Sequence, residues 1–134
     1  MTSAALALQK AVYAALTADA GVGALIGGRI YDGAPRNAAF PYATFGRTTH
    51  SDWSTGTEDG AEHRLILDVW SRAHGKSECH TIAQAIRAAL HDAVLALDGH
   101  ALVNLRFETS DICRDPDGIT VHGVLRFRAV TEPD

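Results

Sequence analysis

Histidine and cysteine side chains are the first candidates for chemistry in this chain, because both bind metals and both take part in catalysis. The sequence holds seven histidines and two cysteines, and three of these side chains gather at His74, Cys79 and His80. Neighbouring residues on a helix point about 100° apart, and no second His/Cys pair has the spacing of zinc ligands. We therefore expect polar groups on a helix surface rather than a metal site.

Other motifs with catalytic or binding potential also fail on spacing. Residues 113–118 resemble part of a calcium loop, but Cys113 is no oxygen ligand and Val124 stands where a glutamate is needed. The sequence has no GxSxG, GxxxxGK[ST] or GxGxxG motif. Residues 50–52 read His-Ser-Asp in a polar loop, which would not fix a catalytic geometry. We predict no catalytic residues, no cofactor and no metal.

Arginine is the dominant cation, with ten Arg against two Lys. Guanidinium groups favour fixed, bidentate contacts. Several arginines occupy alternate positions of expected strands and would share one face of a sheet. We interpret that face as solvated with mixed salt bridges, each worth little; a protein interface and a wall facing DNA remain the alternatives. The arginines concerned are Arg64, Arg106, Arg126 and Arg128.

Hydrophobic spacing indicates the elements that position these side chains. Helices are expected over residues 3–19, capped by Ser3, and from Ser77 to about residue 91, capped by Ser77. Gly21 and Gly23 are expected to end the first helix. Strands are expected at 29–31, 42–48, 62–71, 102–109 and 119–130, with a turn at 115–118.

The order of these elements favours an α+β fold: one domain, residues 1–134, with an antiparallel sheet and two helices packed on one face. Strand 62–71 carries apolar groups on both faces and is expected to be central. Val103, Leu105 and Phe107 are expected to point inward. Residues 131–134 are expected to fray.

The most polar stretch, residues 50–60, reads as an exposed loop with one large apolar side chain, Trp53. A lone aromatic residue there either folds back onto the domain or anchors a contact with a partner, and both alternatives stay open.

Composition sets the remaining limits. The chain has 134 residues, is 46% hydrophobic and carries a net charge of −4, which argues against non-specific coating of nucleic acid. It holds 23 Ala but only four Phe and two Trp, so we expect a thin core and stabilisation by oligomerisation. Two isolated cysteines suit a reducing cytosol. No apolar run approaches the ~18 residues of a membrane span, and the start of the chain does not read as a signal peptide.

Longer runs resemble the tail-terminator, or tail-completion, family of long-tailed phages. The resemblance is carried by the opening ALALQKAVYAALTAD, by GGRIYDGAP and FPYATFG, by EHRLILDVWSR, and by the closing LDGHALVNLRFETSDICRDPDGITVHGVLRFRAVTE. It spans nearly the whole chain. Within the family, the chain resembles the tail terminators of alphaproteobacterial gene transfer agents, which are domesticated phage-like particles.

The resemblance implies a fold similar to that of the phage lambda tail terminator and a structural role without catalysis. It implies a homo-hexameric ring that caps the head-proximal end of the tail tube, stops tube polymerisation and joins the head connector. The implied partners are the tail-tube protein, the head-side connector (neck) protein and DNA, which passes through the lumen without sequence specificity. Synthesis in the bacterial cytoplasm and assembly at the head–tail joint follow, with no membrane involved.

The residue-level hypotheses concern interfaces. Trp53 is a candidate contact for a tube, connector or ring neighbour, and Asp32 and Arg36 are candidates to pair across a subunit boundary. Arg106, Arg126 and Arg128 are the candidates on the arginine-bearing face. Another neck or tail protein (a head-completion or tail-tube subunit) remains an alternative. So does a nucleic-acid-binding module that uses these three arginines and Arg114.

Overall fold

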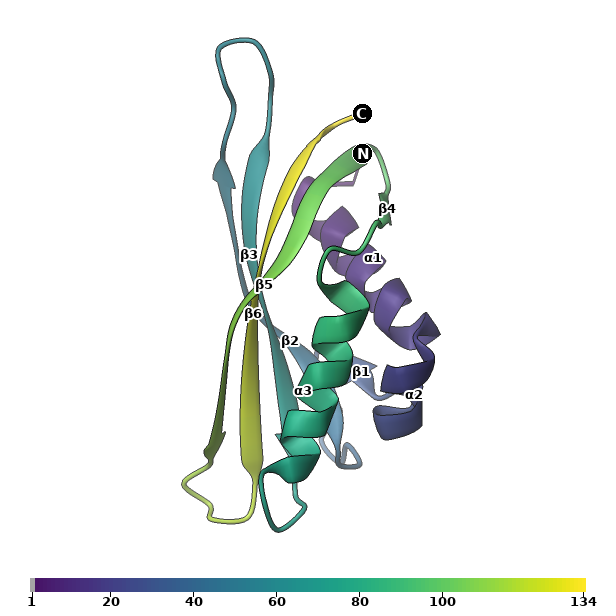
Figure 1. Cartoon of the computed structure of the whole chain (residues 1–134), viewed down its shortest axis with the longest axis vertical. Helices are drawn as coiled ribbons and strands as arrows, with labels where there is room; N and C mark the ends of the chain where they lie inside the picture. The colour runs from purple at the N-terminus through teal and green to yellow at the C-terminus, as the bar shows by residue number, and fades with distance from the viewer. Residues whose placement is uncertain (1) are drawn as a thin grey trace.

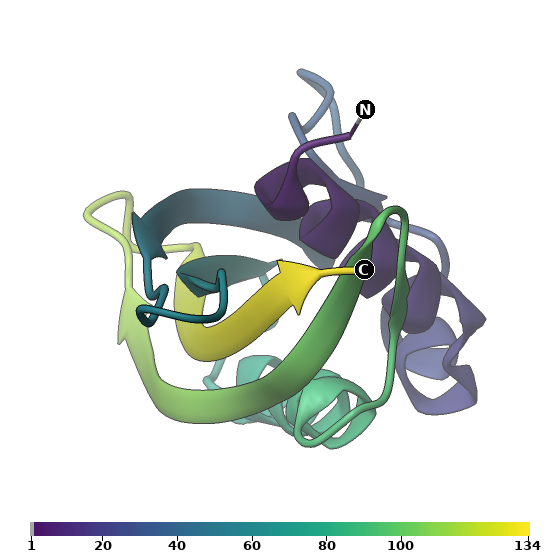
Figure 2. The same cartoon turned by 90° about the horizontal axis from the view of Figure 1, so that it is seen from above.

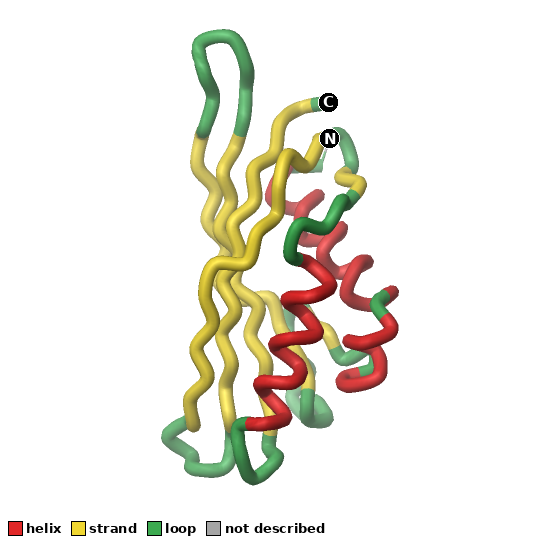
Figure 3. The backbone as a smooth tube through the Cα atoms, viewed as in Figure 1, coloured by secondary structure: helices red, strands yellow, loops and turns green. Residues whose placement is uncertain are grey.

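The computed structural model describes residues 2–134, in which three helices pack on one face of a six-stranded sheet (Figures 1 and 3). The strand order is β1-β2-β3-β6-β5-β4. The short β1 pairs parallel with β2, and the four other neighbouring pairs are antiparallel. In chain order the elements are α1 Ala4–Ala18, α2 Ala20–Ile26, β1 Ile30–Tyr31, β2 Tyr42–Asp52, β3 Ala61–Ser71, α3 Ser77–Leu90, β4 Ala96–Leu97, β5 His100–Arg114 and β6 Val121–Pro133.

The predicted α+β class, with helices on one face of an essentially antiparallel sheet, is confirmed; the helix α2 and the parallel β1 are additions. The prediction that Gly21 and Gly23 end the first helix is wrong, because both lie inside α2. Asp19 makes the break instead. Its extended backbone ends α1, and its carboxylate accepts a hydrogen bond from the Val22 N–H at 2.9 Å, which caps α2.

The two predicted helix caps have different outcomes. The Ser3 hydroxyl accepts a hydrogen bond from the Leu6 N–H at 3.1 Å, so the cap of α1 is confirmed. Ser77 is instead the first residue of α3, and Lys76 precedes it without a side-chain cap. The carboxylate of Glu78 lies in the first turn of α3, where the helix dipole favours negative charge, and it accepts a hydrogen bond from Ser71 at 2.6 Å.

Four long strands, β2, β3, β6 and β5, form a strongly curled sheet (Figure 2). The prediction that the strand around residues 62–71 is central is confirmed, since β3 lies between β2 and β6. Bulges interrupt the ladder after Phe45 in β2, and after Leu102 and Phe107 in β5. The first β5 bulge makes the inward prediction for Val103 wrong: this residue is the extra one and is 53% exposed, whereas Leu105 is buried.

The end of the chain is part of the sheet. The expectation that residues 131–134 fray is wrong for most of them, because β6 continues to Pro133 and pairs with the start of β5. Asp134 N–H also bonds to the Gly99 carbonyl. The N-terminus lies beside the C-terminus (Figure 1). There the Thr2 hydroxyl donates a hydrogen bond to the Asp98 carboxylate, and the Thr2 carbonyl oxygen contacts Nε2 of His100. Both termini therefore lie at the end of the molecule that carries the β2–β3 loop.

The hydrophobic core lies between the helices and the inner face of the sheet. Alternate residues of β3 and β6 point into it, as the period-2 pattern of these strands predicts. The largest fully buried apolar side chains are Leu8, Leu16, Ile26, Leu67, Ile82, Ile86, Leu90, Leu105, Leu125 and Phe127.

The helix α3 packs tightly against the sheet at Gly123 of β6. A Cβ at Gly123 would lie 2.7 Å from Sγ of Cys79, a distance at which atoms overlap. Burial raises the pKa of the Cys79 thiol to about 11, so this sulfur is a neutral packing group. Glycine is therefore required at position 123 by space rather than by backbone conformation.

We predict that Gly123→Ala lowers the free energy of unfolding by about 1–3 kcal/mol, because the added methyl overpacks the contact with α3. Urea unfolding followed by circular dichroism measures this change. Adding Cys79→Ala should recover much of the loss by removing the sulfur. Gly75→Ala, at a turn position with open space around it, is the control. Equal unfolding midpoints for Gly123→Ala and the control would refute the packing argument.

Candidate interaction surface

The sheet face turned away from the helices, here called the open face, is covered by charged side chains that pair across strands. It is defined by Arg64 and Asp68 of β3 and by His122, Arg126 and Arg128 of β6. The register places these residues on one face. Arg64 lies opposite Arg128, and Ile66, which lies opposite Arg126, is two residues before Asp68 on the same face of β3. Repulsion between such clustered cations has to be balanced, and nearby carboxylates do so.

Three arginines of the open face each pair with a carboxylate from another strand of the sheet. Arg64 binds Glu108 of β5. Arg126 binds Asp111 of β5 at 2.7 Å, and Arg128 binds Glu62 of β3 at 2.7 Å. The predicted face of mixed salt bridges is thus present, and its cations are largely neutralised within the subunit. Individually, such exposed pairs add at most about 1 kcal/mol.

A stacked group holds the part of the open face near the β5–β6 turn. The ring of His122 lies flat on the indole of Trp70, with centroids 3.9 Å apart and planes 6° from parallel. Nε2 of His122 lies 2.7 Å from the Asp68 carboxylate, and Nδ1 lies 4.0 Å from Asp115. Trp70 Nε1–H donates to the hydroxyl of Thr44 on β2. Both imidazole nitrogens face carboxylates. The contacts of His122 with β3 and of Trp70 with β2 together link the strands β2, β3 and β6.

Trp53 begins the β2–β3 loop, which projects beyond the rest of the molecule (Figure 1). The polar loop predicted for residues 50–60 is shorter in the structure, since β2 runs to Asp52 and pairs with β3 up to Ala61. The Arg128 guanidinium lies 5.2 Å from the centre of the Trp53 ring. Trp53 remains 54% exposed. One face of the ring is therefore held by the domain, and the rest is available to a partner.

Hydrogen bonds within this loop give it a defined shape. The Trp53 N–H donates to the Gly60 carbonyl, and the Thr55 N–H donates to the Glu58 carbonyl. The Ser54 hydroxyl donates to the Asp52 carboxylate at 2.6 Å, and this hydrogen bond lowers the pKa of that carboxyl group. The loop extends the hairpin rather than forming a separate lobe.

A buried histidine lies at the base of this hairpin. His63 of β3 is fully buried, and its Nε2 lies 2.8 Å from the Thr131 hydroxyl. In residues 2–134 its Nδ1 has no hydrogen-bond partner. Burial, and secondly the charges of His50 and His100, lower the pKa of His63 to about 4. The side chain is therefore neutral at pH 7.

Of the remaining predicted interface residues, Asp32 and Arg36 lie elsewhere, whereas Arg106 lies opposite Arg128 on the open face. Asp32 and Arg36 are both exposed in the loop between β1 and β2, and no ion pair joins them within residues 2–134. Arg106 of β5 is exposed and reaches Asp92 at 3.9 Å. The structure thus brings Trp53, Arg106, Arg126 and Arg128 onto or beside one face and leaves Asp32 and Arg36 apart from it.

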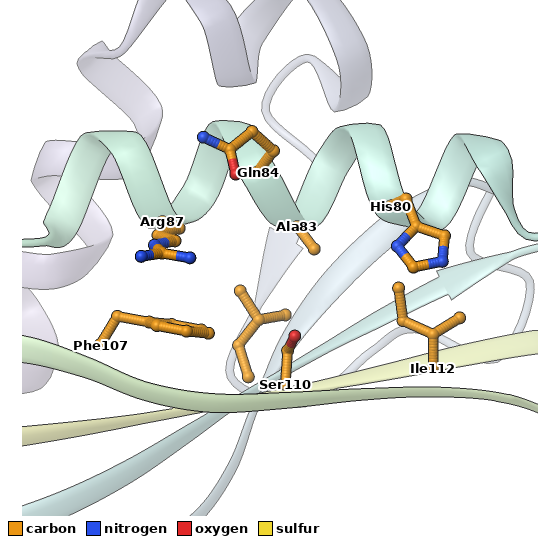
Figure 4. A pocket seen from close by; sticks show the side chains of 8 residues that line it. His80, Ala83, Gln84, Arg87, Phe107, Ser110 and Ile112 are labelled. Carbon is orange, nitrogen blue, oxygen red and sulfur yellow. The ribbon is translucent and has the colours of Figure 1, made fainter.

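A shallow groove runs between α3 and β5. Arg87 of α3 lies over the ring of Phe107, and His80 lies across the groove from Ile112 (Figure 4). Gln84 and Ser110 also line the groove. The residues that line it include no carboxylate or thiol. Within residues 2–134 no three His, Cys, Asp or Glu side chains are arranged to hold a metal ion, and no helix is long and apolar enough to cross a membrane.

Two of the acidic partners on the open face, Glu62 and Asp111, were missed by the sequence reasoning. Glu62 was expected only as the start of a strand, and Asp111 fell beyond the predicted end of the strand at residue 109. Continued alternation would not have found Asp111, because the bulge after Phe107 shifts the phase of the strand. After this bulge Thr109, Asp111 and Cys113 share the open face with Arg126, Val124 and His122.

Comparisons with known proteins agree with one another. The family described as Tail completion protein gp17 matches residues 10–132. The Tail completion protein gp17 of Bacillus phage SPP1 is 24% identical over 89 residues, which is 66% of each chain. A chain in the solved virion of the native gene transfer agent particle is 34% identical, with a TM-score of 0.91 over 98% of this chain and 99% of that one. The structure of SPP1 gp17 has a TM-score of 0.66 at 22% identity, covering 94% and 89%, and shows the same fold.

We predict that stability falls between pH 6.5 and about 4 because of His63. The unfolded histidine binds a proton below pH 6.5, but the buried one does not until about pH 4. Stability is therefore intact at pH 7 and is lost as the pH falls, by up to about 3 kcal/mol. Urea unfolding at several pH values measures this. His63→Gln should flatten the dependence, while His74→Gln, at an exposed position, should not. Equal slopes for the two variants would refute it.

We predict that removing the carboxylates from the open face makes the protein bind DNA. The variant Glu62→Gln/Glu108→Gln/Asp111→Asn frees three arginines, so its affinity should exceed that of the unmodified protein and fall linearly with log salt. The control, Glu58→Gln/Asp59→Asn/Glu132→Gln, changes the net charge equally at the end of the molecule near the loop. Fluorescence anisotropy with duplex DNA is the measurement. Equal binding by both variants would show that net charge, not the face, decides.

Proposed function

Because this chain belongs to the tail completion protein gp17 family, a family of structural tail proteins, we propose that it forms a ring that caps the head-proximal end of a tail tube. In this role the ring stops tube polymerisation and provides the joint to the head connector. The observation that carries the proposal is the match over 98% of the chain, at 34% identity, to a chain of a gene transfer agent virion.

The proposed subunit works by contact rather than by catalysis. Its partners are further copies of itself in a homo-hexameric ring, the tail-tube protein and the head-side connector. It is made in the cytoplasm and incorporated into the particle at the head–tail joint. The family description, tail completion, supports a position where the tail is finished.

We assign the open face to the lumen through which DNA passes. A wall for passing DNA must not retain phosphate groups, and the pairing of Arg64, Arg126 and Arg128 with carboxylates meets this requirement. This assignment accounts for a face that is rich in arginine yet nearly neutral. It also replaces the alternative of a DNA-binding module, which would need free guanidinium groups.

Two contact regions follow from exposure. Trp53 projects at one end of the molecule with about half of its surface uncovered, which suits a contact with the tube or the connector. Asp32 and Arg36, exposed on a loop away from the open face, are proposed to pair across a boundary between ring subunits.

Deleting the gene is expected to leave heads and tails unjoined, with tail tubes longer than normal. Electron microscopy of lysates gives both the fraction of joined particles and the tube lengths, and restoring the gene provides the control. Joined particles with tubes of normal length would refute the proposed cap. Unjoined particles with normal tube lengths would favour a head-completion protein.

Complementation of the deletion with Trp53→Ala tests the loop contact. We expect fewer joined particles, because the partner loses an aromatic anchor, with a folded subunit shown by its circular dichroism spectrum. Thr57→Ala in the same loop is the matched control. Full joining by Trp53→Ala would remove this residue from the interface.

A further inference from the structure

The long strands leave two edges of the sheet without a partner strand. On one side, β1 covers β2 only at Ala43 and Thr44, so residues 45–52 pair with β3 alone. On the other side, β4 covers β5 only at its first two residues. His91 accepts a hydrogen bond from the Phe107 N–H, and the Asp92 N–H donates to the Leu105 carbonyl. Residues 108–114 then pair with β6 alone.

Unpaired strand edges attract further strands, and monomeric proteins usually cover them. Here β1 covers only the start of β2, and β4 with the segment after α3 covers the first half of β5, so the rest of each edge is free. We call the two uncovered stretches the β2 edge (residues 45–52) and the β5 edge (residues 108–114).

The directions of the strands allow these two edges to meet. Along the sheet β2, β3, β6 and β5 alternate in direction. A copy related by rotation about an axis keeps these directions, so β5 of one copy lies antiparallel to β2 of the next. The same alternation would continue from subunit to subunit, as a head-to-tail ring requires.

The two edges lie at different heights along the strands. Through the pairings, Thr49 of β2 is level with Arg106 of β5, whereas Ala43 is level with Ile112. The middle of the β2 edge is therefore offset from the middle of the β5 edge by about four residues, or roughly 13 Å.

This offset fits a closed ring. Four strand spacings per subunit amount to about 19 Å across the strands. A shift of roughly 13 Å along the strands over that width corresponds to strands inclined by about 35° to the ring axis, which is the inclination of closed β-barrels. Edges without an offset would require strands parallel to the axis.

The side chains at the two edges have complementary charge. Arg47 on the β2 edge is exposed, and no carboxylate lies within 4.0 Å of it in residues 2–134. Asp111 on the β5 edge is 70% exposed despite its contact with Arg126. When the middles of the two edges are aligned, residues 48–49 of one copy lie opposite Asp111 of the next, and Arg47 lies opposite residues 112–113. The long Arg47 side chain then reaches Asp111 as a diagonal neighbour on the open face.

We propose that the β2 edge of one subunit pairs with the β5 edge of a second copy, so that neighbouring sheets join into one continuous antiparallel sheet. The inference rests on the proposed ring and names the surfaces that close it. Arg47 and Asp111 then form a pair between subunits, and the open face becomes an uninterrupted inner wall.

Disulfide cross-linking tests the pairing, because the exposed Cys113 lies on the β5 edge. Arg47→Cys, Thr49→Cys and Ser51→Cys, made one at a time, place a thiol on the open face of the β2 edge. Arg47→Cys lies opposite Cys113 when the two edges are aligned, and the other two variants cover registers shifted by two and four residues. Under mild oxidation, at least one should give a covalent ladder beyond the dimer. Combining it with Cys113→Ser should abolish the ladder, and Thr48→Cys, on the opposite face, should give none.

A charge exchange provides an independent test. Arg47→Asp and Asp111→Arg should each reduce the mass measured by light scattering, and the double variant should restore it. No ladder from any of the three cysteine variants would overturn the edge pairing, whether the protein is oligomeric or monomeric. A multi-subunit mass without a ladder would be consistent with the ring but would reject these edges as its interface. The role of the ring in the tail is tested separately, by the phenotype of the gene deletion.

Discussion

The whole structure depends on a sheet that is buried on one face only. Along β3 and β6 successive side chains alternate between the helices and the open face, so each strand contributes one set of side chains to the core and another to the open face. The inner one is apolar and close-packed, down to the contact of Gly123 with Cys79. The set on the open face is polar and places several arginines close together, and the paired carboxylates offset the repulsion between them.

The curl of the sheet determines where the helices and the β2–β3 hairpin lie. Bulges in β2 and β5 admit extra residues, and each bulge changes which face the following residues occupy. Figure 2 shows the curl of the sheet, and in Figure 1 the helices lie on one side of it while the β2–β3 hairpin extends past them. This hairpin carries Trp53, and the buried His63 at its base joins it to the last residues of β6.

Sequence patterns predicted the class of fold, the central strand and the turn at residues 115–118, because these depend on local period and on turn residues. The Gly118 N–H bonds to the Asp115 carbonyl, as expected for that turn. Features set by contacts across the sheet were not predictable in this way. The prediction for Val103 failed because a bulge turns this residue outward. The cap predicted at Ser77 failed because Lys76 occupies the cap position of α3, without a side-chain hydrogen bond. Asp111 was missed because β5 runs beyond the predicted end of its strand. The six interface residues remain predictions, since contacts with partners leave little trace in one chain's pattern.

The two chain termini leave the fold at the same end as the β2–β3 loop (Figure 1). A fluorescent protein or gold-binding tag fused to either terminus would therefore mark that end alone. A small label in the β5–β6 turn, for instance at the exposed Asp117, would mark the opposite end. The chain thus offers distinct attachment points for establishing, in a projection image, which way the subunit is oriented along the axis of a particle.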